Sequence, residues 1–214
     1  MEREVHPILT DLQKCYPDLK PTIPSIEASY ELLSATYRHG GKLLICGNGG
    51  SAADSDHIVG ELMKAFERSR PIDDSLRQRL QQLDPASGAY LAERLQGALP
   101  AISLSSHTAL ITAISNDIAG DLIFAQQVLG YGKKGDTLIA ISTSGTSANV
   151  LHALRVARAL ELNTIGLTGK SGGSMRELCD VTICVPYERT SAIQERHLPI
   201  YHALCAMLEQ EFFG

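Results

Sequence analysis

The sequence predicts an α/β fold in which a five-stranded parallel sheet lies between two layers of helices. From residue 43 onward, short apolar runs alternate with longer segments that have helical periodicity. The apolar runs are continuous, which is typical of strands that are buried on both faces. Strands that alternate with helices form a parallel sheet, because each helix carries the chain back across it.

The predicted strands are KLLICG (42–47), AISL (101–104), GDTLIAIS (135–142), NTIGLTG (163–169) and DVTICVP (180–186). Helices are predicted over residues 8–39, 51–67, 108–116, 122–130, 146–162 and about 190–212, with a short one at 171–178. Pro21 and Pro24 interrupt the first of these segments, because proline lacks a backbone donor. Residues 1–214 are predicted to form a single domain with N-terminal helices over 1–40.

Residues 69–98 do not fit the alternation of strands and helices. They are rich in charge and are broken in the middle by DPASG, so we expect a helical hairpin inserted between the first core helix and the second strand. One interpretation is a solvated addition with no function of its own. The other is a lid or an oligomer contact, because long insertions in compact domains often serve as one of these.

The overall composition excludes several classes of protein. The chain has 214 residues, 44% of them apolar, and a formal net charge of −5, which gives no sign of a nucleic-acid-binding surface. No apolar run reaches the roughly 18 residues that a membrane-spanning helix needs, and the N-terminus lacks the pattern of a signal peptide. The five cysteines are scattered, so we expect reduced thiols in a cytoplasmic protein.

Two loops at strand ends have the composition of anion-binding sites. GNGGS (47–51) follows the first strand and STSGTS (142–147) follows the third, and each opens a helix. Free N–H groups at a helix N-terminus attract anions, and glycines allow a ligand to approach the backbone. Tight turns with serine or threonine caps would explain either loop alone, with Ser51 as the cap in the first. Together they favour a phosphorylated small molecule.

An imidazole and a carboxylate follow the first of these loops on one helix face. His57 and Glu61 are four residues apart, and the last helix offers Gln194 and His202 at a spacing that puts them within roughly 80° of each other. Pro199 lies between them, so that helix either kinks or starts anew. If the two helices converge, Glu61 and a histidine suit proton transfer, and the four side chains could also hold a divalent metal.

The ordered set CGNGGSAADSDHIVGEL, SND, GDTLIAISTSGTSANV, TIGLTGKSGGSM and IQERHLPIYH resembles the sugar isomerase (SIS) domain family, and within it the phosphoheptose isomerases. The resemblance covers about residues 25–212 apart from the insertion. It implies a flavodoxin-like three-layer sandwich in a homotetramer with active sites at subunit interfaces. It also implies interconversion of sedoheptulose 7-phosphate and glycero-manno-heptose 7-phosphate through an enediol, with no nucleotide cofactor.

The resemblance implies a role for each residue that matches a family motif. Glu61 would be the catalytic base, and His202 would be the acid or a zinc ligand. The zinc ion found in some members would be held by His57, Glu61, Gln194 and His202. Substrate would contact Gln194 and the residues of the polar loops, which are Asn48, Gly49, Gly50, Ser51, Asn116, Asp117, Ser142, Thr143, Ser144 and Ser147.

Two departures from the family pattern bear on which sugar is the substrate more than on the class of reaction. Members often carry an arginine in an ELxGR pattern after the base, where this chain has ELMKAF with Ala65 at that position. Lys64 and Arg68 are possible substitutes, although neither shares the helical face of Ala65. The insertion at 69–98 is the second departure. The alternative that the chain is an isomerase of another sugar phosphate therefore stays open.

Proteins of other classes with this domain are the remaining alternatives. One is a non-catalytic phosphosugar- or partner-binding scaffold, such as a replication-initiator-binding protein, in which the acid–base pair is not needed. The presence of both Glu61 and His202 favours an enzyme. Another is a sensor in a transcription regulator, but the residues before KLLICG are too few and too acidic for a helix-turn-helix domain.

Overall fold

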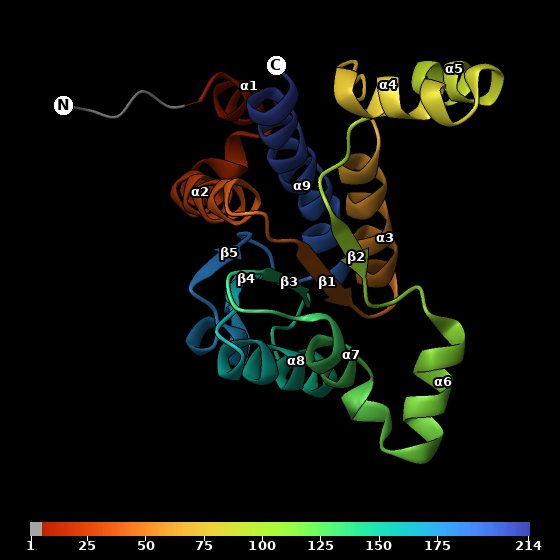
Figure 1. Cartoon of the computed structure of the whole chain (residues 1–214). Helices are drawn as coiled ribbons and strands as arrows, with labels where there is room; N and C mark the ends of the chain where they lie inside the picture. Colours follow the sequence, from red (N-terminus) through yellow and green to blue (C-terminus); the bar gives the residue numbers. More distant parts are fainter. Residues whose placement is uncertain (1–5) are drawn as a thin grey trace.

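The computed structural model describes residues 6–214 and has the predicted α/β architecture (Figure 1). Its five strands are β1 (Leu43–Gly47), β2 (Ala101–Ser103), β3 (Thr137–Ile141), β4 (Asn163–Thr168) and β5 (Val181–Cys184). They form one sheet in the order β2-β1-β3-β4-β5, and every neighbouring pair is parallel. The predicted five-stranded parallel sheet is therefore confirmed.

Outside the inserted hairpin, the α-helices are α1 (Pro7–Cys15), α2 (Ile23–Arg38), α3 (Gly50–Met63), α6 (Thr108–Asp117), α7 (Ile123–Tyr131), α8 (Ala148–Ala159) and α9 (Thr190–Phe213), of which α6 projects away from the sheet (Figure 1). Short 3-10 helices lie at η1 (Pro17–Thr22), η2 (Gly120–Leu122) and η3 (Gly173–Glu177). The inserted hairpin consists of α4 (Asp74–Leu83) and α5 (Pro85–Arg94). No helix in this described part of the chain has the length and hydrophobicity needed to cross a membrane.

Alternate residues of each strand face two separate cores. Leu43 and Ile45 of β1 belong to a core that includes residues of α1, α2, α3 and α9. Leu44 and Cys46 of the same strand face the opposite side, against α7 and α8. Both sides of the sheet are thus covered by apolar helix faces, and the continuous apolar runs follow from this double burial. The three-layer arrangement predicted from the sequence is confirmed.

The structure corrects one predicted helix end and answers the question that Pro199 left open, both in the helices that carry the acid–base residues. The helix predicted over 51–67 ends at Met63, because Lys64 adopts an extended conformation with φ −142° and ψ 176°. The last helix contains Pro199 yet runs without a break from Thr190 to Phe213, so it does not start anew. Lys64 and Arg68 lie beyond the end of α3, so the argument about a shared helical face does not apply to them.

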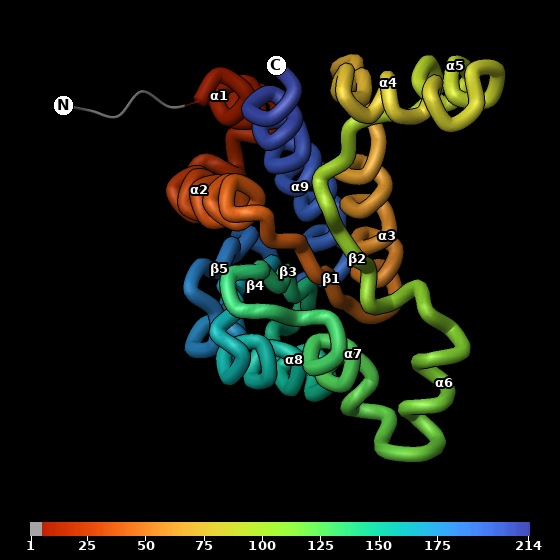
Figure 2. Tube along the Cα trace, viewed as in Figure 1, coloured from red at the N-terminus to blue at the C-terminus, as the bar shows by residue number. Residues whose placement is uncertain are grey.

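The hairpin α4–α5 stands apart from the sheet, beyond the C-terminal end of α3 (Figures 1 and 2). Asp84 ends α4 and caps α5, accepting hydrogen bonds from the backbone N–H groups of Ala86 and Ser87. At its base, Pro71 and Gln96 form an isolated antiparallel bridge. Leu83 at its tip is 85% exposed, so the hairpin contributes little to the core of the sheet. The predicted helical insertion is confirmed.

Candidate active site

The GNGGS loop makes a sharp turn from β1 into α3. Gly49 precedes the helix with φ +58°, a conformation that favours glycine, and the N–H of Ser51 donates to the Asn48 carbonyl at 3.0 Å. Ser51 is buried inside the first turn of α3, so the interpretation of Ser51 as the helix cap is wrong. No side chain caps the N-terminus of α3, and the N–H groups of Ser51 and Ala52 donate instead to the carbonyls of Asn48 and Gly49 in the loop.

The STSGTS loop brings several hydroxyl groups together at the start of α8. Ser142 Oγ lies 3.0 Å from Ser147 Oγ and 3.5 Å from Ser144 Oγ. Ser147 occupies the cap position, but its side chain makes no capping hydrogen bond to the helix. Gly145 has φ +67°, and a Cβ there would lie 2.2 Å from the Gly172 carbonyl oxygen of the following strand's loop. The hydroxyl cluster is thus held against a neighbouring loop.

The two loops lie side by side at the switch point of the sheet. From β1 the chain continues to β2 on one side, while β3 pairs with the other side of β1, and ligands of open α/β sheets bind at such a point. Asn48 of the first loop and Asn149 of α8 exchange two side-chain hydrogen bonds, both 2.9 Å long. The sequence analysis missed Asn149, because only the fold places it beside Asn48.

Convergence of α3 and α9 brings the predicted acid–base residues together. His57 Nε2 lies 3.2 Å from Glu61 Oε1 and 3.5 Å from His202 Nε2. Glu61 and His202 therefore meet at one imidazole, although they are far apart in the sequence. Lys64 Nζ lies 3.5 Å from Glu61 Oε2, so this lysine places a cation beside the carboxylate.

A polar chain behind His57 orients its ring. The Tyr201 hydroxyl donates to Asp54 Oδ1 at 3.2 Å and lies 3.0 Å from His57 Nδ1. A hydroxyl has one proton, so Tyr201 must accept from a protonated Nδ1 when it donates to Asp54. In this tautomer His57 Nε2 carries a lone pair and faces the Glu61 carboxylate, which is also an acceptor. A proton or a cation between Nε2 and the carboxylate oxygen is therefore needed to hold the two together. Burial raises the pKa of Asp54, opposed by the Tyr201 hydrogen bond and by His57.

His202 lies between this cluster and a pocket. The Phe66 ring packs on it with a centroid distance of 5.3 Å, and a pocket of about 410 Å³ opens beside both residues toward α1. The pKa of His202 is lowered first by burial and then by His57, with Glu61 and Glu67 opposing the shift. A neutral imidazole is thus favoured, which can accept or donate a proton near neutral pH.

Other predicted residues lie away from this cluster in a single chain. Gln194 lies beside the glycine turn, where a Cβ on Gly50 would come within 2.5 Å of its Nε2. Asn116 and Asp117 end α6 and bond to each other at 2.7 Å, and within residues 6–214 no hydrogen bond links them to the other predicted site residues. The structure therefore assembles the loops and the acid–base cluster, but not Asn116 and Asp117.

The predicted zinc ligands are only partly arranged for a metal. Two imidazole nitrogens and a carboxylate are donors that zinc accepts, and His57 Nε2 contacts both of the others. Gln194 lies eight residues before His202 on α9, about 12 Å along the helix axis. Across residues 6–214, no three His, Cys, Asp or Glu side chains are disposed as a metal-binding set. Zinc at these four residues stays a prediction.

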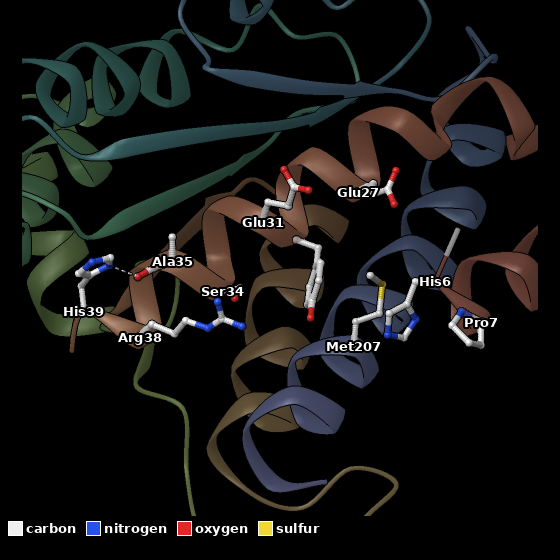
Figure 3. A pocket seen from close by; sticks show the side chains of 10 residues that line it. His6, Pro7, Glu27, Glu31, Ser34, Ala35, Arg38, His39 and Met207 are labelled. Carbon is white, nitrogen blue, oxygen red and sulfur yellow. Dashed lines mark hydrogen bonds between the residues drawn. The ribbon is translucent and has the colours of Figure 1, made fainter. Parts of the chain in front are cut away.

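A second pocket of about 680 Å³ lies between α1, α2 and α9, away from every predicted site residue (Figure 3). Its wall includes Tyr30, Ser34 and Arg38, all of which bond to the Glu211 carboxylate. These contacts join the C-terminal end of α9 to α2. The pocket therefore belongs to the helical layer and not to the switch point of the sheet.

Comparison with known proteins agrees with this geometry. A family model described as "SIS domain" matches residues 19–103 and 80–169, which together span more than half of the chain. The chain belongs to the SIS domain family. This SIS protein is 39% identical over 209 residues to a phosphoheptose isomerase of Rhodospirillum rubrum, covering 98% of this chain and 97% of that one.

Two further relatives carry the same name. A phosphoheptose isomerase of Trichlorobacter lovleyi is 42% identical over 193 residues, which cover 90% of the SIS protein and 85% of the relative. The solved structure of phosphoheptose isomerase from Neisseria gonorrhoeae superposes with a TM-score of 0.73 at 31% identity, covering 94% of each chain. The resemblance stated from the sequence is therefore confirmed, as is the fold that it implied.

Proposed function

We propose that the protein is a phosphoheptose isomerase that interconverts sedoheptulose 7-phosphate and glycero-manno-heptose 7-phosphate. The observation that carries this proposal is the cluster in which Glu61 and His202 meet at His57. The relatives named above, about 40% identical over most of the chain, support the same reaction class. A scaffold that only binds a sugar phosphate would need the two loops but not this cluster.

The chemistry requires a base and an acid that act on neighbouring carbons. The Glu61 carboxylate removes a proton from C1 of the ketose while the protonated form of His202 gives a proton to the oxygen on C2, which produces an enediol. The proton held by Glu61 then returns to C2 and the proton on the C1 oxygen passes back to His202, which restores the acid and produces the aldose. The net change is a transfer of hydrogen between the C1 and C2 groups of the sugar, so no oxidant is needed. The loop hydroxyls and the N-terminal N–H groups of α3 and α8 would hold the phosphate.

A zinc ion at His57, Glu61, Gln194 and His202 remains part of this proposal. If bound, it would polarise the carbonyl and hydroxyl oxygens of the substrate. His57 suits this role, because Tyr201 and Asp54 fix the tautomer that presents Nε2. Activity measured after dialysis against a chelator, and again after adding zinc, tests whether the metal is needed.

The proposal also includes a homotetramer in the cytoplasm. In α6 only Ile114 is fully buried, while Leu110 is 38% exposed, and Ile118 just after the helix is 55% exposed. An apolar helix with so little cover in its own chain is typical of a subunit contact. The same helix carries Asn116 and Asp117, so a neighbouring copy could complete the substrate site with them. The free thiols of all five cysteines agree with a reducing compartment.

Solvent-deuterium incorporation tests the proposed reaction directly. Sedoheptulose 7-phosphate in D2O is followed by proton NMR with the wild-type protein, with Glu61→Gln, and with Glu93→Gln on the exposed hairpin as the matched control. We expect loss of the C1 proton signals with the wild type and the control, and none with Glu61→Gln. Exchange that persists in Glu61→Gln would exclude Glu61 as the base. No exchange with the wild type would reject this substrate and direct the test to other sugar phosphates.

A further inference from the structure

A fully buried ion pair lies just beyond the C-terminal end of α3, past the acid–base cluster. Arg70 and Glu209 are each 1% exposed, and Arg70 Nε lies 2.7 Å from Glu209 Oε1. Removing two charges from water is costly, so such a pair persists only where its remaining hydrogen-bonding groups are also satisfied. The contacts of both side chains therefore indicate what the pair does.

Arg70 binds the last turn of the helix that carries the base. Its Nη1 donates to the Leu62 carbonyl at 2.8 Å, and its Nη2 donates to the Glu61 carbonyl at 2.9 Å. Carbonyls in the last turn of a helix lack intrahelical partners, and a cation there also complements the helix dipole. The guanidinium additionally stacks over the Phe213 ring at 4.8 Å. The backbone of Glu61 is thereby fixed by a group outside α3.

Glu209 binds the segment that covers the acid. Its carboxylate accepts hydrogen bonds from the backbone N–H groups of Phe66, Glu67 and Arg68 at 2.8–3.1 Å. The Phe66 ring held in this way packs on His202. Burial alone would raise the pKa of Glu209, but the N–H groups of Phe66 and Glu67 and the Arg70 guanidinium lower it overall, as expected for a carboxylate held by hydrogen bonds. One ion pair thus supports the surroundings of both members of the acid–base pair.

We infer that Arg70 and Glu209 are positioning residues for the isomerisation, because together they fix the backbone of Glu61 and the ring that packs on His202. This inference rests on the proposed function. Proton transfer depends on the reacting groups being held within fractions of an ångström, and a free helix end would fray. Within the described residues, both side chains bond to each other and to backbone groups, and not to the Glu61 carboxylate or the His202 ring, so we expect their effect to be on the geometry of the catalytic groups.

The test compares charge-conserving and shape-conserving variants of the full-length protein. Arg70→Lys keeps the charge but cannot reach Glu209 and two carbonyls with one ammonium group, and Glu209→Gln keeps the shape but loses the charge. Arg79→Lys and Glu93→Gln on the exposed hairpin are the matched controls. Circular dichroism, Tm, and kcat and KM for sedoheptulose 7-phosphate are measured well below Tm.

We expect both pair variants to lose at least about tenfold in kcat with KM changed by less than about threefold, while the controls match the wild type. A lower Tm with wild-type kcat per folded molecule would overturn the inference and leave a purely structural pair. If either variant fails to fold, Phe66→Leu replaces it, because it leaves the ion pair intact. Wild-type kcat in Phe66→Leu would then overturn the inference. A wild-type protein inactive on this sugar would reject the proposed function itself, a result distinct from a normal kcat in the variants.

Discussion

A buried histidine in α9 should make the protein sensitive to acid. His197 of α9 has no exposed surface, and neither of its ring nitrogens has a hydrogen-bond partner. Burial lowers its pKa to about 4, and the Thr168 backbone opposes this shift without forming a hydrogen bond that satisfies the ring. His197 is therefore neutral in the folded protein at every pH at which the protein is expected to work.

The size of the effect follows from the difference in proton binding between the two states. The unfolded chain binds a proton at His197 near its ordinary pKa of about 6.5, while the folded chain does so only near pH 4. The stability that comes from a neutral His197 is complete above pH 6.5 and is lost as the pH falls toward 4. Between pH 7 and pH 5 the loss is about 2 kcal/mol, or roughly 4–8 °C in Tm for a chain of this length.

The variant His197→Leu isolates this contribution, because leucine packs in an apolar site and does not titrate. Tm is measured at pH 7, 6 and 5 for the wild type, for His197→Leu and for His39→Leu, a control at an exposed histidine. We expect the wild type and the control to lose stability in parallel and His197→Leu to lose about 2 kcal/mol less. Equal pH dependence in the wild type and His197→Leu would refute the argument that His197 is buried and neutral.

Three further changes test other parts of the site. Gly145→Ala should lower the free energy of unfolding by several kcal/mol, because its Cβ would lie 2.2 Å from the Gly172 carbonyl oxygen and its backbone has φ +67°. An unchanged Tm in thermal unfolding would contradict the close contact. Asn149→Ala should raise KM by about five- to tenfold with kcat little changed, because it removes the two hydrogen bonds to Asn48. An unchanged KM would mean that this amide pair does not shape the proposed phosphate site. Leu110→Glu should lower the oligomer mass in sedimentation experiments by placing a charge on the exposed side of α6, and an unchanged mass would remove α6 from the subunit contact.

The sequence was most informative where function depends on local structure. The strands could be located because each is a continuous apolar run, and the two loops could be located because glycine and hydroxyl residues follow those runs directly. His57 and Glu61 could be paired because four residues separate them on one helix. Each of these predictions needs only the geometry of a single strand, turn or helix.

The remaining features depend on contacts between distant segments. The end of α3 at Met63 was missed, because the N–H groups that would extend the helix are taken by Glu209 from the far end of the chain. Tyr201 was missed although it adjoins His202, since its role depends on the packing of α9 against α3. Asp54 lies three residues before His57 on the same helix face, and this spacing was the one local signal that could have identified it.

The parallel packing of α3 and α9 explains why these distant residues act together. Three contacts follow one another in the same direction along α9 and along α3 with the chain beyond it. They join Gly50 to Gln194, His57 to His202, and Arg70 to Glu209. The first contact lies at the GNGGS loop, the second at the proposed proton transfer and the third at the buried ion pair. A shift of α9 along α3 would disturb all three at once, so we expect a variant that loosens the buried pair to displace the other two contacts as well.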